Sequence, residues 1–82
     1  VPQKVLSLNL LKKGISVISA LSNESNFIKS ISESRRALKE KSILINKIKV
    51  DEEYRLGLSD LIGKKFILLQ RGKKNYFILK FN

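Results

Sequence analysis

Two adjacent arginines, Arg35 and Arg36, stand in the stretch Ser30–Asn46, and Lys39 and Lys41 follow them closely. The planar guanidinium fork of arginine matches phosphate oxygens and can donate two hydrogen bonds to one phosphate group. The N-terminus of a helix in this stretch would add backbone N–H donors that favour an anion. An ordinary solvated helix face is the alternative interpretation, and the combined charges favour phosphate binding over it.

A second basic cluster lies near the C-terminus, in the segment Arg71–Asn75. Arg71, Lys73 and Lys74 occupy one predicted tight turn, and no acidic residue follows Asp60 in the sequence. Such crowding of like charges is unfavourable unless a polyanion relieves it. A solubilising turn is the alternative interpretation. The cations of this turn are therefore candidates for contact with nucleic acid.

The residues that most often perform catalysis are absent, because the 82-residue sequence contains neither histidine nor cysteine. This composition excludes a histidine general base, a thiolate nucleophile and a disulfide framework. The seven Asp and Glu residues stand mostly beside lysines or in expected loops, where they are solvated. No glycine-rich phosphate loop or metal-ligand spacing occurs. We therefore expect this chain to be non-catalytic and to hold no cofactor of its own.

The charge balance indicates a polyanionic partner. Seventeen Lys and Arg residues against seven Asp and Glu residues give a formal net charge of +10. A membrane surface suits the chain less well, because the expected apolar faces are short and are needed for a core. The apolar run Val5–Leu21 is interrupted by Lys12, Lys13 and Gly14, so it does not predict a spanning helix. The absence of cysteine agrees with a cytoplasmic location.

Two short helices are predicted in the N-terminal half, where they would carry the first basic cluster. The first covers Ile15–Leu21 with Ser16 as its cap, and it ends within the polar tract Ser22–Asn26. The second begins at Ser30, whose spacing to Glu33 is typical of a capping box, and Ser32 is the alternative cap. The second helix is expected to be amphipathic, with its basic residues on the flank of a core-facing side.

The side of the second helix that meets the core is predicted to carry Ile31, Ser34 and Leu38. Residues 1–14 are expected to be an entry segment or linker from an upstream domain, in the form of a short strand or of a tether, and residues 15–82 the folded domain. The chain lacks methionine and begins Val1-Pro2, which suggests a piece of a longer protein.

Strands are predicted in the C-terminal half from its apolar runs and alternating residues. The expected strands are Ser42–Asn46, Ile48–Val50, Phe66–Leu69 and Tyr76–Phe81. Asn46-Lys47 would form the first turn and Ser59–Leu61 a single helical turn. Phe77, Leu79 and Phe81 would point inward. The predicted fold class is α+β, with two short N-terminal helices packed on a small antiparallel or mixed sheet.

The helix and strand of Ser30–Asn46 resemble the signature of the RNA-binding domains named after ribosomal protein S-four. That signature has a Ser, an acid or Gln, a small residue, an Arg, and a later Val/Ile-x-Val/Ile-Asn. The matching positions are Ser30 or Ser32, Glu33, Ser34, Arg35, Arg36, Leu38, Ile43, Ile45 and Asn46. The sequence departs at Lys47, where the family usually has Gly, and at Ser34, where Ala is usual. The resemblance implies an S-four-like RNA-binding motif.

The segment Gln70–Tyr76, followed by an alternating apolar end, resembles the C-terminus of bacterial-type tyrosyl-tRNA synthetases. This resemblance implies a domain that binds tRNA-Tyr near its anticodon stem and long variable arm. It also implies a cytoplasmic, homodimeric parent enzyme that joins tyrosine to this tRNA with ATP and Mg²⁺, whose catalytic motifs lie upstream. The isolated domain is expected to be a monomer. A stand-alone S-four-like module, in a ribosome-associated or RNA-modifying protein, is the alternative.

By position, the resemblance assigns phosphate contacts to the first basic cluster and makes the C-terminal turn a second basic wall. The predicted RNA-binding residues are Ser30, Arg35, Arg36, Lys39, Lys41, Asn46, Arg71, Lys73, Lys74 and Asn75. Tyr76 is a weaker candidate, which would stack on a base or ribose.

Overall fold

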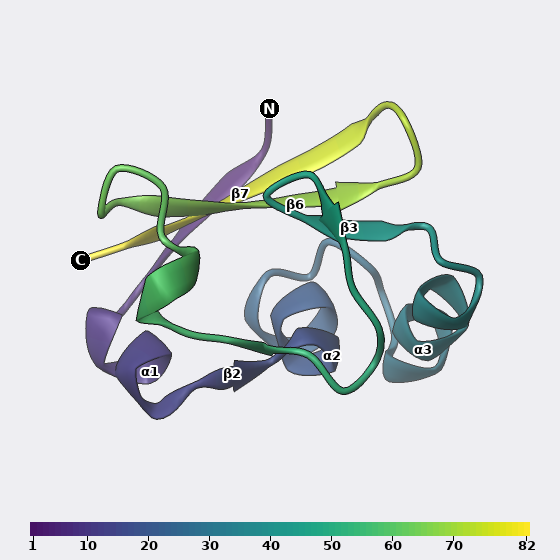
Figure 1. Ribbon diagram of the computed structural model, residues 1–82, viewed down its shortest axis with the longest axis horizontal. Helices are drawn as coiled ribbons and strands as arrows, with labels where there is room; N and C mark the ends of the chain where they lie inside the picture. Colours follow the sequence, from purple (N-terminus) through teal and green to yellow (C-terminus); the bar gives the residue numbers. More distant parts are fainter.

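A five-stranded mixed sheet forms one layer of the domain, and helices cover one of its two faces (Figure 1). The computed structural model describes residues 1–82. The strand order is β1-β7-β6-β3-β4, with β1 parallel to β7 and every other pair antiparallel. The strands are β1 (Gln3–Leu6), β3 (Ile43–Ile45), β4 (Ile48–Lys49), β6 (Phe66–Arg71) and β7 (Asn75–Phe81). The predicted α+β class with a mixed sheet is confirmed.

The second layer contains the helices and one small strand pair. The strands β2 (Ile15–Ser16) and β5 (Arg55–Leu56) pair antiparallel beneath the main sheet (Figure 1). The helical elements are α1 (Leu8–Lys13), α2 (Val17–Ser19), the π-helical η1 (Ala20–Glu24), α3 (Ile31–Lys39) and the 3₁₀ turn η2 (Leu58–Asp60). The predicted first helix therefore corresponds to α2 and η1 together, and it ends at Glu24 within the expected polar tract.

Residues 1–14, which the sequence analysis assigns to a linker, contribute a strand and a helix to this domain. β1 pairs with β7 over four residues, and the Leu8 N–H donates to the Asn82 carbonyl at 2.8 Å. The side chain of Leu11 in α1 is completely buried. Of the two alternatives for this segment the structure shows the short strand, and its pairing with β7 could not be predicted because the partner lies at the other end of the chain. Whether these residues also lead to an upstream domain stays a prediction.

Serine side chains begin two of the helices, as the sequence analysis predicts. The Ser16 hydroxyl accepts the N–H of Ser19 at 3.2 Å, and the Ser30 hydroxyl accepts the N–H of Glu33 at 3.1 Å. The second half of the predicted capping box is wrong, because the Glu33 carboxylate does not reach back to the Ser30 N–H. It bonds to Arg71 instead, which makes Glu33 part of a tertiary contact.

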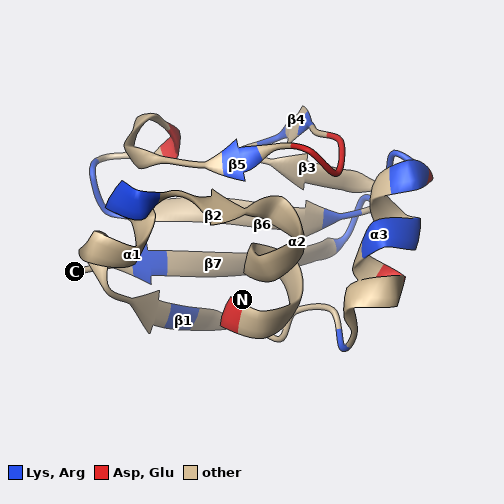
Figure 2. Cartoon of the chain, turned by 90° about the horizontal axis from the view of Figure 1, so that it is seen from below, with Lys and Arg blue, Asp and Glu red and all other residues tan.

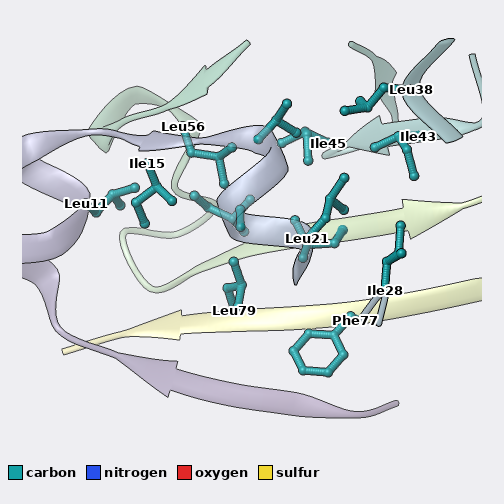
Figure 3. Close-up of a cluster of buried hydrophobic side chains, with 14 of the residues drawn as sticks. Leu11, Ile15, Leu21, Ile28, Leu38, Ile43, Ile45, Leu56, Phe77 and Leu79 are labelled. Carbon is teal, nitrogen blue, oxygen red and sulfur yellow. The ribbon is translucent and has the colours of Figure 1, made fainter. Parts of the chain in front are cut away.

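The core consists of 16 buried apolar side chains between the sheet and the helices, most of which are drawn in Figure 3. Phe77, Leu79 and Phe81 of β7 point inward as predicted. The prediction that Ile31 faces the core is wrong, since 43% of this residue is exposed. Ser34 and Leu38 are buried as predicted, and the Ser34 hydroxyl donates to the Ser30 carbonyl at 3.0 Å, which satisfies its polar group inside the core.

The turn between β3 and β4 contains Asn46 and Lys47, whose φ angles are 52° and 70°. Ile45 pairs with Ile48 across it, so two residues with positive φ close the hairpin, as in a type I′ turn. Lys47 thus adopts the left-handed conformation that the glycine of the S-four-like signature would adopt at lower cost. The sequence departs from the signature here, but the hairpin still forms.

A hydrogen-bonded turn orders the long connection between β4 and β6. The Tyr54 hydroxyl donates to one oxygen of Asp60, whose other oxygen accepts the Gly57 N–H at 2.8 Å. The bond to Asp60, together with burial, raises the pKa of Tyr54 to about 12. Because this pKa lies above the ordinary value of 10.0, the stabilisation is complete below pH 10 and is lost as the pH rises through about 12.

We predict that Tyr54→Phe lowers the free energy of unfolding by about 1.5 kcal/mol, because a bond to a carboxylate is lost. Urea denaturation at neutral pH measures the change, and an ultraviolet titration of phenolate should lose its transition near pH 12. Tyr76→Phe is the control, since the Tyr76 hydroxyl has only a long 3.4 Å bond to the Lys73 carbonyl. Equal losses in the two variants would contradict the assignment.

Candidate nucleic-acid interface

The two predicted basic clusters lie at the same end of the molecule, on α3 and on the turn between β6 and β7 (Figures 1 and 2). On α3, the side chains of Arg35, Arg36 and Lys39 are exposed. On the turn, Lys73 and Lys74 are exposed as well. None of these five cations forms an ion pair, because the structure contains a single ion pair and it involves other residues.

That ion pair joins α3 to the end of β6. The Arg71 guanidinium donates from Nη1 to Oε2 of Glu33 at 2.6 Å, and both side chains are about one-third or more exposed (34% and 40%). This contact corrects the expectation that the C-terminal turn has no acid nearby. Glu33 precedes Arg71 by 38 residues, so the sequence alone gave no sign of the pairing. The pair holds the two basic clusters side by side.

The electrostatic effect of the basic end is visible at Glu33. The hydrogen bond from Arg71 lowers the pKa of Glu33 below its ordinary 4.5, and partial desolvation opposes this shift. The charges of Arg71, Arg36 and Lys29 lower the pKa further. Glu33 therefore remains ionised under all but acidic conditions and offsets part of the positive charge around it.

Ser30 and Asn46, both predicted to contact RNA, have structural contacts here. Ser30 caps α3 as described above. The Asn46 side chain donates to the Asp60 carbonyl and accepts the Leu68 N–H at 2.9 Å, so its amide connects the β3–β4 turn to β6 and η2. The amide nitrogen and oxygen of Asn46 are thus both bonded within the fold. A direct contact of Ser30 or Asn46 with RNA stays a prediction.

Lys41 lies just past the C-terminus of α3, at a position that usually favours glycine. Its φ is 59°, its N–H donates to Leu38, and the N–H of Ser42 donates to Ala37 at 3.1 Å. These two bonds form a Schellman motif, with Lys41 as the left-handed residue. The side chain of Lys41 is exposed beside the basic end.

Acidic side chains lie near part of this surface. Lys39 and Lys41 line a hollow of about 460 Å³ together with Asp51 and Glu52 of the loop after β4. No pair across it meets the ion-pair distance. The acidic loop is exposed, as predicted, and it bounds the positive surface on this side.

A second hollow, of about 430 Å³, lies beside the C-terminal turn. It brings together three of the predicted residues, and its lining is Val1, Pro2, Phe27, Arg71, Lys74, Asn75 and Tyr76. Tyr76 has a neighbour that the sequence analysis did not foresee, because Nζ of Lys47 lies 5.7 Å from the centre of its ring. This cation–π contact places a further lysine near the turn.

The basic end has the groups that bind an anion. No group of three or more Asp or Glu side chains is placed to hold a metal ion. No helix has both the length and the apolar character needed to cross a membrane. What the basic end offers is a set of unpaired guanidinium and ammonium groups on two adjoining elements, which can contact successive phosphates of a nucleic-acid backbone.

Comparison with known proteins gives a consistent family. The model of the tyrosine–tRNA ligase SYY-like C-terminal domain matches residues 1–79. The chain belongs to this family. The match covers β1 and α1 as well as the two basic clusters, in agreement with the integration of residues 1–14 into the fold.

Individual relatives are named tyrosine–tRNA ligase. The protein of Flavobacterium psychrophilum is 48% identical over 79 residues, which is 96% of this chain and 18% of the relative. That of Flavobacterium johnsoniae is 41% identical over 80 residues, or 98% and 19%. That of Ureaplasma parvum is 39% identical over 72 residues, or 87% and 17%. The chain thus spans about one-fifth of the length of these relatives.

We predict that Arg71→Gln raises the pKa of Glu33 toward its ordinary value of 4.5, because the main cause of the lowering is removed. NMR titration of the Glu33 carboxyl group measures this shift. In the unaltered chain the pair contributes stability above the ordinary pKa, and this contribution is lost as the pH falls through the lowered one.

Lys74→Gln is the matched control, since it removes one charge from the same turn but no ion pair. It should leave the titration of Glu33 nearly unchanged. If both variants shift the carboxyl equally, the general charge of the turn, and not the Arg71 contact, sets the ionisation of Glu33.

Proposed function

We propose that this chain is the tRNA-binding C-terminal domain of a bacterial-type tyrosyl-tRNA synthetase and that it binds the phosphate backbone of tRNA-Tyr. One observation carries the proposal. In a chain of this family, two clusters of cations without ion pairs lie at the same end of the molecule, on α3 and on the β6–β7 turn, and the Glu33–Arg71 pair joins α3 to the end of β6. Phosphates are the groups that such clusters recognise.

The balance of charge supports a polyanion as the partner. The net charge is +10, and only one of the seventeen basic side chains is paired within the fold. Keeping so many like charges together in the free protein is unfavourable. Binding of RNA relieves this repulsion and releases counterions from the RNA, which adds to the affinity.

The two clusters would act as the two walls of an S-four-like RNA-binding site. Arg35, Arg36 and Lys39 on α3 would contact one run of phosphates, and Lys73 and Lys74 on the turn another. Contacts of this kind fix the position of an RNA and follow its shape, and they do not distinguish base sequences directly. The proposed target is the region between the anticodon stem and the long variable arm of tRNA-Tyr.

The parent protein would be a cytoplasmic, homodimeric ligase that joins tyrosine to tRNA-Tyr at the expense of ATP, with Mg²⁺. The 82 residues hold no acidic cluster that could bind this ion, and the catalytic residues would lie elsewhere in the longer chain. The domain would support the reaction by holding the tRNA. The match to a C-terminal domain family argues against the alternative of a stand-alone RNA-binding module.

We predict that binding of tRNA-Tyr to this chain weakens steeply with salt, because cations on the protein replace counterions on the RNA. Arg35→Gln and Lys73→Gln should each weaken binding by roughly 1 kcal/mol and lower the slope of log K against log salt by roughly 0.9. Fluorescence anisotropy over a range of salt concentrations measures both quantities. A tRNA without the long arm should bind less tightly.

Lys12→Gln is the matched control, since Lys12 is exposed on α1, at the opposite end of the molecule from α3 (Figure 1). Its affinity and salt slope should equal those of the unaltered chain. Affinity that does not change with salt would refute the proposal, as would equal effects of Lys12→Gln and Lys73→Gln.

We predict that Lys41→Gly raises the stability of the domain but lowers its affinity for tRNA. Glycine adopts a φ of 59° without steric cost, so the free energy of unfolding should rise by about 0.5–1 kcal/mol. Affinity for tRNA should fall nevertheless, because a cation of the basic end is lost. Thermal unfolding and anisotropy measure the two effects, and Lys64→Gly is the control, since Lys64 has a φ of 60° in the turn before β6.

A further inference from the structure

A third hollow lies on the face of the sheet that carries no helix, next to the C-terminal turn. Its volume is about 300 Å³, and its lining is Lys41, Ser42, Leu44, Lys49, Gln70, Gly72 and Lys73. Three lysines from three separate elements therefore line one hollow, and no acidic residue does. The phosphate sites proposed above involve α3 and the turn, whereas this hollow lies over β3, β4 and β6.

The strand register explains how these residues meet. Leu44 of β3 pairs with Lys49 on one side and with Gln70 on the other, so the three form one row across the sheet. Gln70 in turn pairs with Tyr76 of β7, which extends the row. Residues paired in this way project from the same face of a sheet. The row thus places a lysine and an amide on the two sides of an apolar residue.

Gln70 is the unusual member of this row. Only 8% of it is exposed, its Nε2 donates to the Gly72 carbonyl at 2.8 Å, and its Oε1 has no hydrogen-bond partner. The bond to Gly72 fixes which end of the amide is the oxygen, since a flipped amide would set two carbonyl oxygens against each other. A buried acceptor without a donor costs free energy in the unbound protein.

The side chains of the lining favour a ligand that carries both a negative charge and a hydrogen-bond donor. The ammonium groups of Lys41, Lys49 and Lys73 attract a negatively charged ligand. Oε1 of Gln70 can only accept a hydrogen bond, so it requires a donor. A phosphodiester carries no proton at neutral pH, so it satisfies the lysines and leaves Gln70 unpaired. In RNA, each phosphate lies next to a ribose 2′-hydroxyl, which can donate.

We propose that this hollow is a ribose–phosphate subsite that selects RNA over DNA. Lys41, Lys49 and Lys73 hold one phosphate of the backbone. A small shift of the Gln70 side chain uncovers Oε1, which is buried in the free protein, and this oxygen accepts a hydrogen bond from the neighbouring 2′-hydroxyl. The inference rests on the proposed function, because it assumes that RNA reaches this end of the molecule. It adds Lys49 and Gln70 to the interface and assigns to Gln70 the discrimination of the sugar.

The test compares one stem-loop of tRNA-Tyr made as RNA and as DNA of the same sequence. Gln70→Met, which keeps the length of the side chain but has no acceptor oxygen, should reduce the preference for RNA roughly fivefold, the worth of one hydrogen bond. Lys49→Gln should weaken both ligands alike and lower the salt slope by roughly 0.7–0.9. Lys12→Gln should change neither the affinity nor the preference.

A measurement on the unaltered chain is independent of whether Gln70→Met folds. The NMR signals of the Gln70 side-chain amide should move further on addition of the RNA stem-loop than on addition of the DNA or of inorganic phosphate, because only RNA brings a hydrogen-bond donor to Oε1. Equal movement with all three ligands, or movement with none, would overturn the proposal. So would a Gln70→Met variant that folds and keeps the full preference for RNA.

The outcomes also separate this inference from the function on which it rests. If no nucleic acid binds in a salt-dependent way, the proposed function fails. If tRNA binds with a steep salt dependence but Lys49→Gln behaves like Lys12→Gln, only the subsite is refuted, and the phosphates lie on α3 and the turn alone.

Discussion

The contact between Glu33 and Arg71 is the interaction on which the basic end depends. It is the single ion pair of a chain with seventeen basic and seven acidic residues. An exposed ion pair generally contributes little to stability. The importance of this pair is that it positions two elements relative to each other. It ties the first turn of α3 to the last residue of β6, and so places cations from distant parts of the chain on one surface. Backbone bonds add to this link, because the Gly72 N–H donates to the Ser42 carbonyl at 2.8 Å and Ile43 of β3 pairs with Arg71.

The same shortage of acids shapes the rest of the surface. Most lysines and arginines lie exposed, where water and salt screen part of the repulsion between them. Polar groups that do enter the interior find partners within the fold: Ser34 donates to Ser30, and the amide of Asn46 bonds at both ends. Oε1 of Gln70 is the exception. Polar atoms are rarely buried without a partner, so the unpaired Oε1 of Gln70 is a departure from the rest of this fold.

Local patterns in the sequence were sufficient for the elements that carry the site. The cap at Ser30, the β3–β4 hairpin and the inward residues of β7 depend on neighbours within a few positions, and each was predicted correctly. What could not be predicted depends on contacts between distant residues. β1 forms by pairing with β7, and the small strand β2 by pairing with β5. The ion pair of Arg71 likewise depends on Glu33, which lies far away in the sequence. Lys49 and Gln70 were missed for the same reason, because the hollow that they share exists only once β3 lies between β4 and β6.

The lysines in left-handed backbone conformations show how stability and charge compete in this fold. Lys41 and Lys47 have φ angles of 59° and 70°, where glycine would avoid a steric cost of roughly 1 kcal/mol per residue. Both lie near the basic end, one lining two hollows and the other over the ring of Tyr76. Lys64 has the same conformation away from this surface, so left-handed lysine alone is no sign of function. The distinction lies in what surrounds each lysine: at Lys41 the strained backbone directs a cation toward a hollow that two other lysines share. The end of α3 needs this backbone conformation but not a lysine side chain, so the positive charge at position 41 is kept at a cost in stability that glycine would avoid.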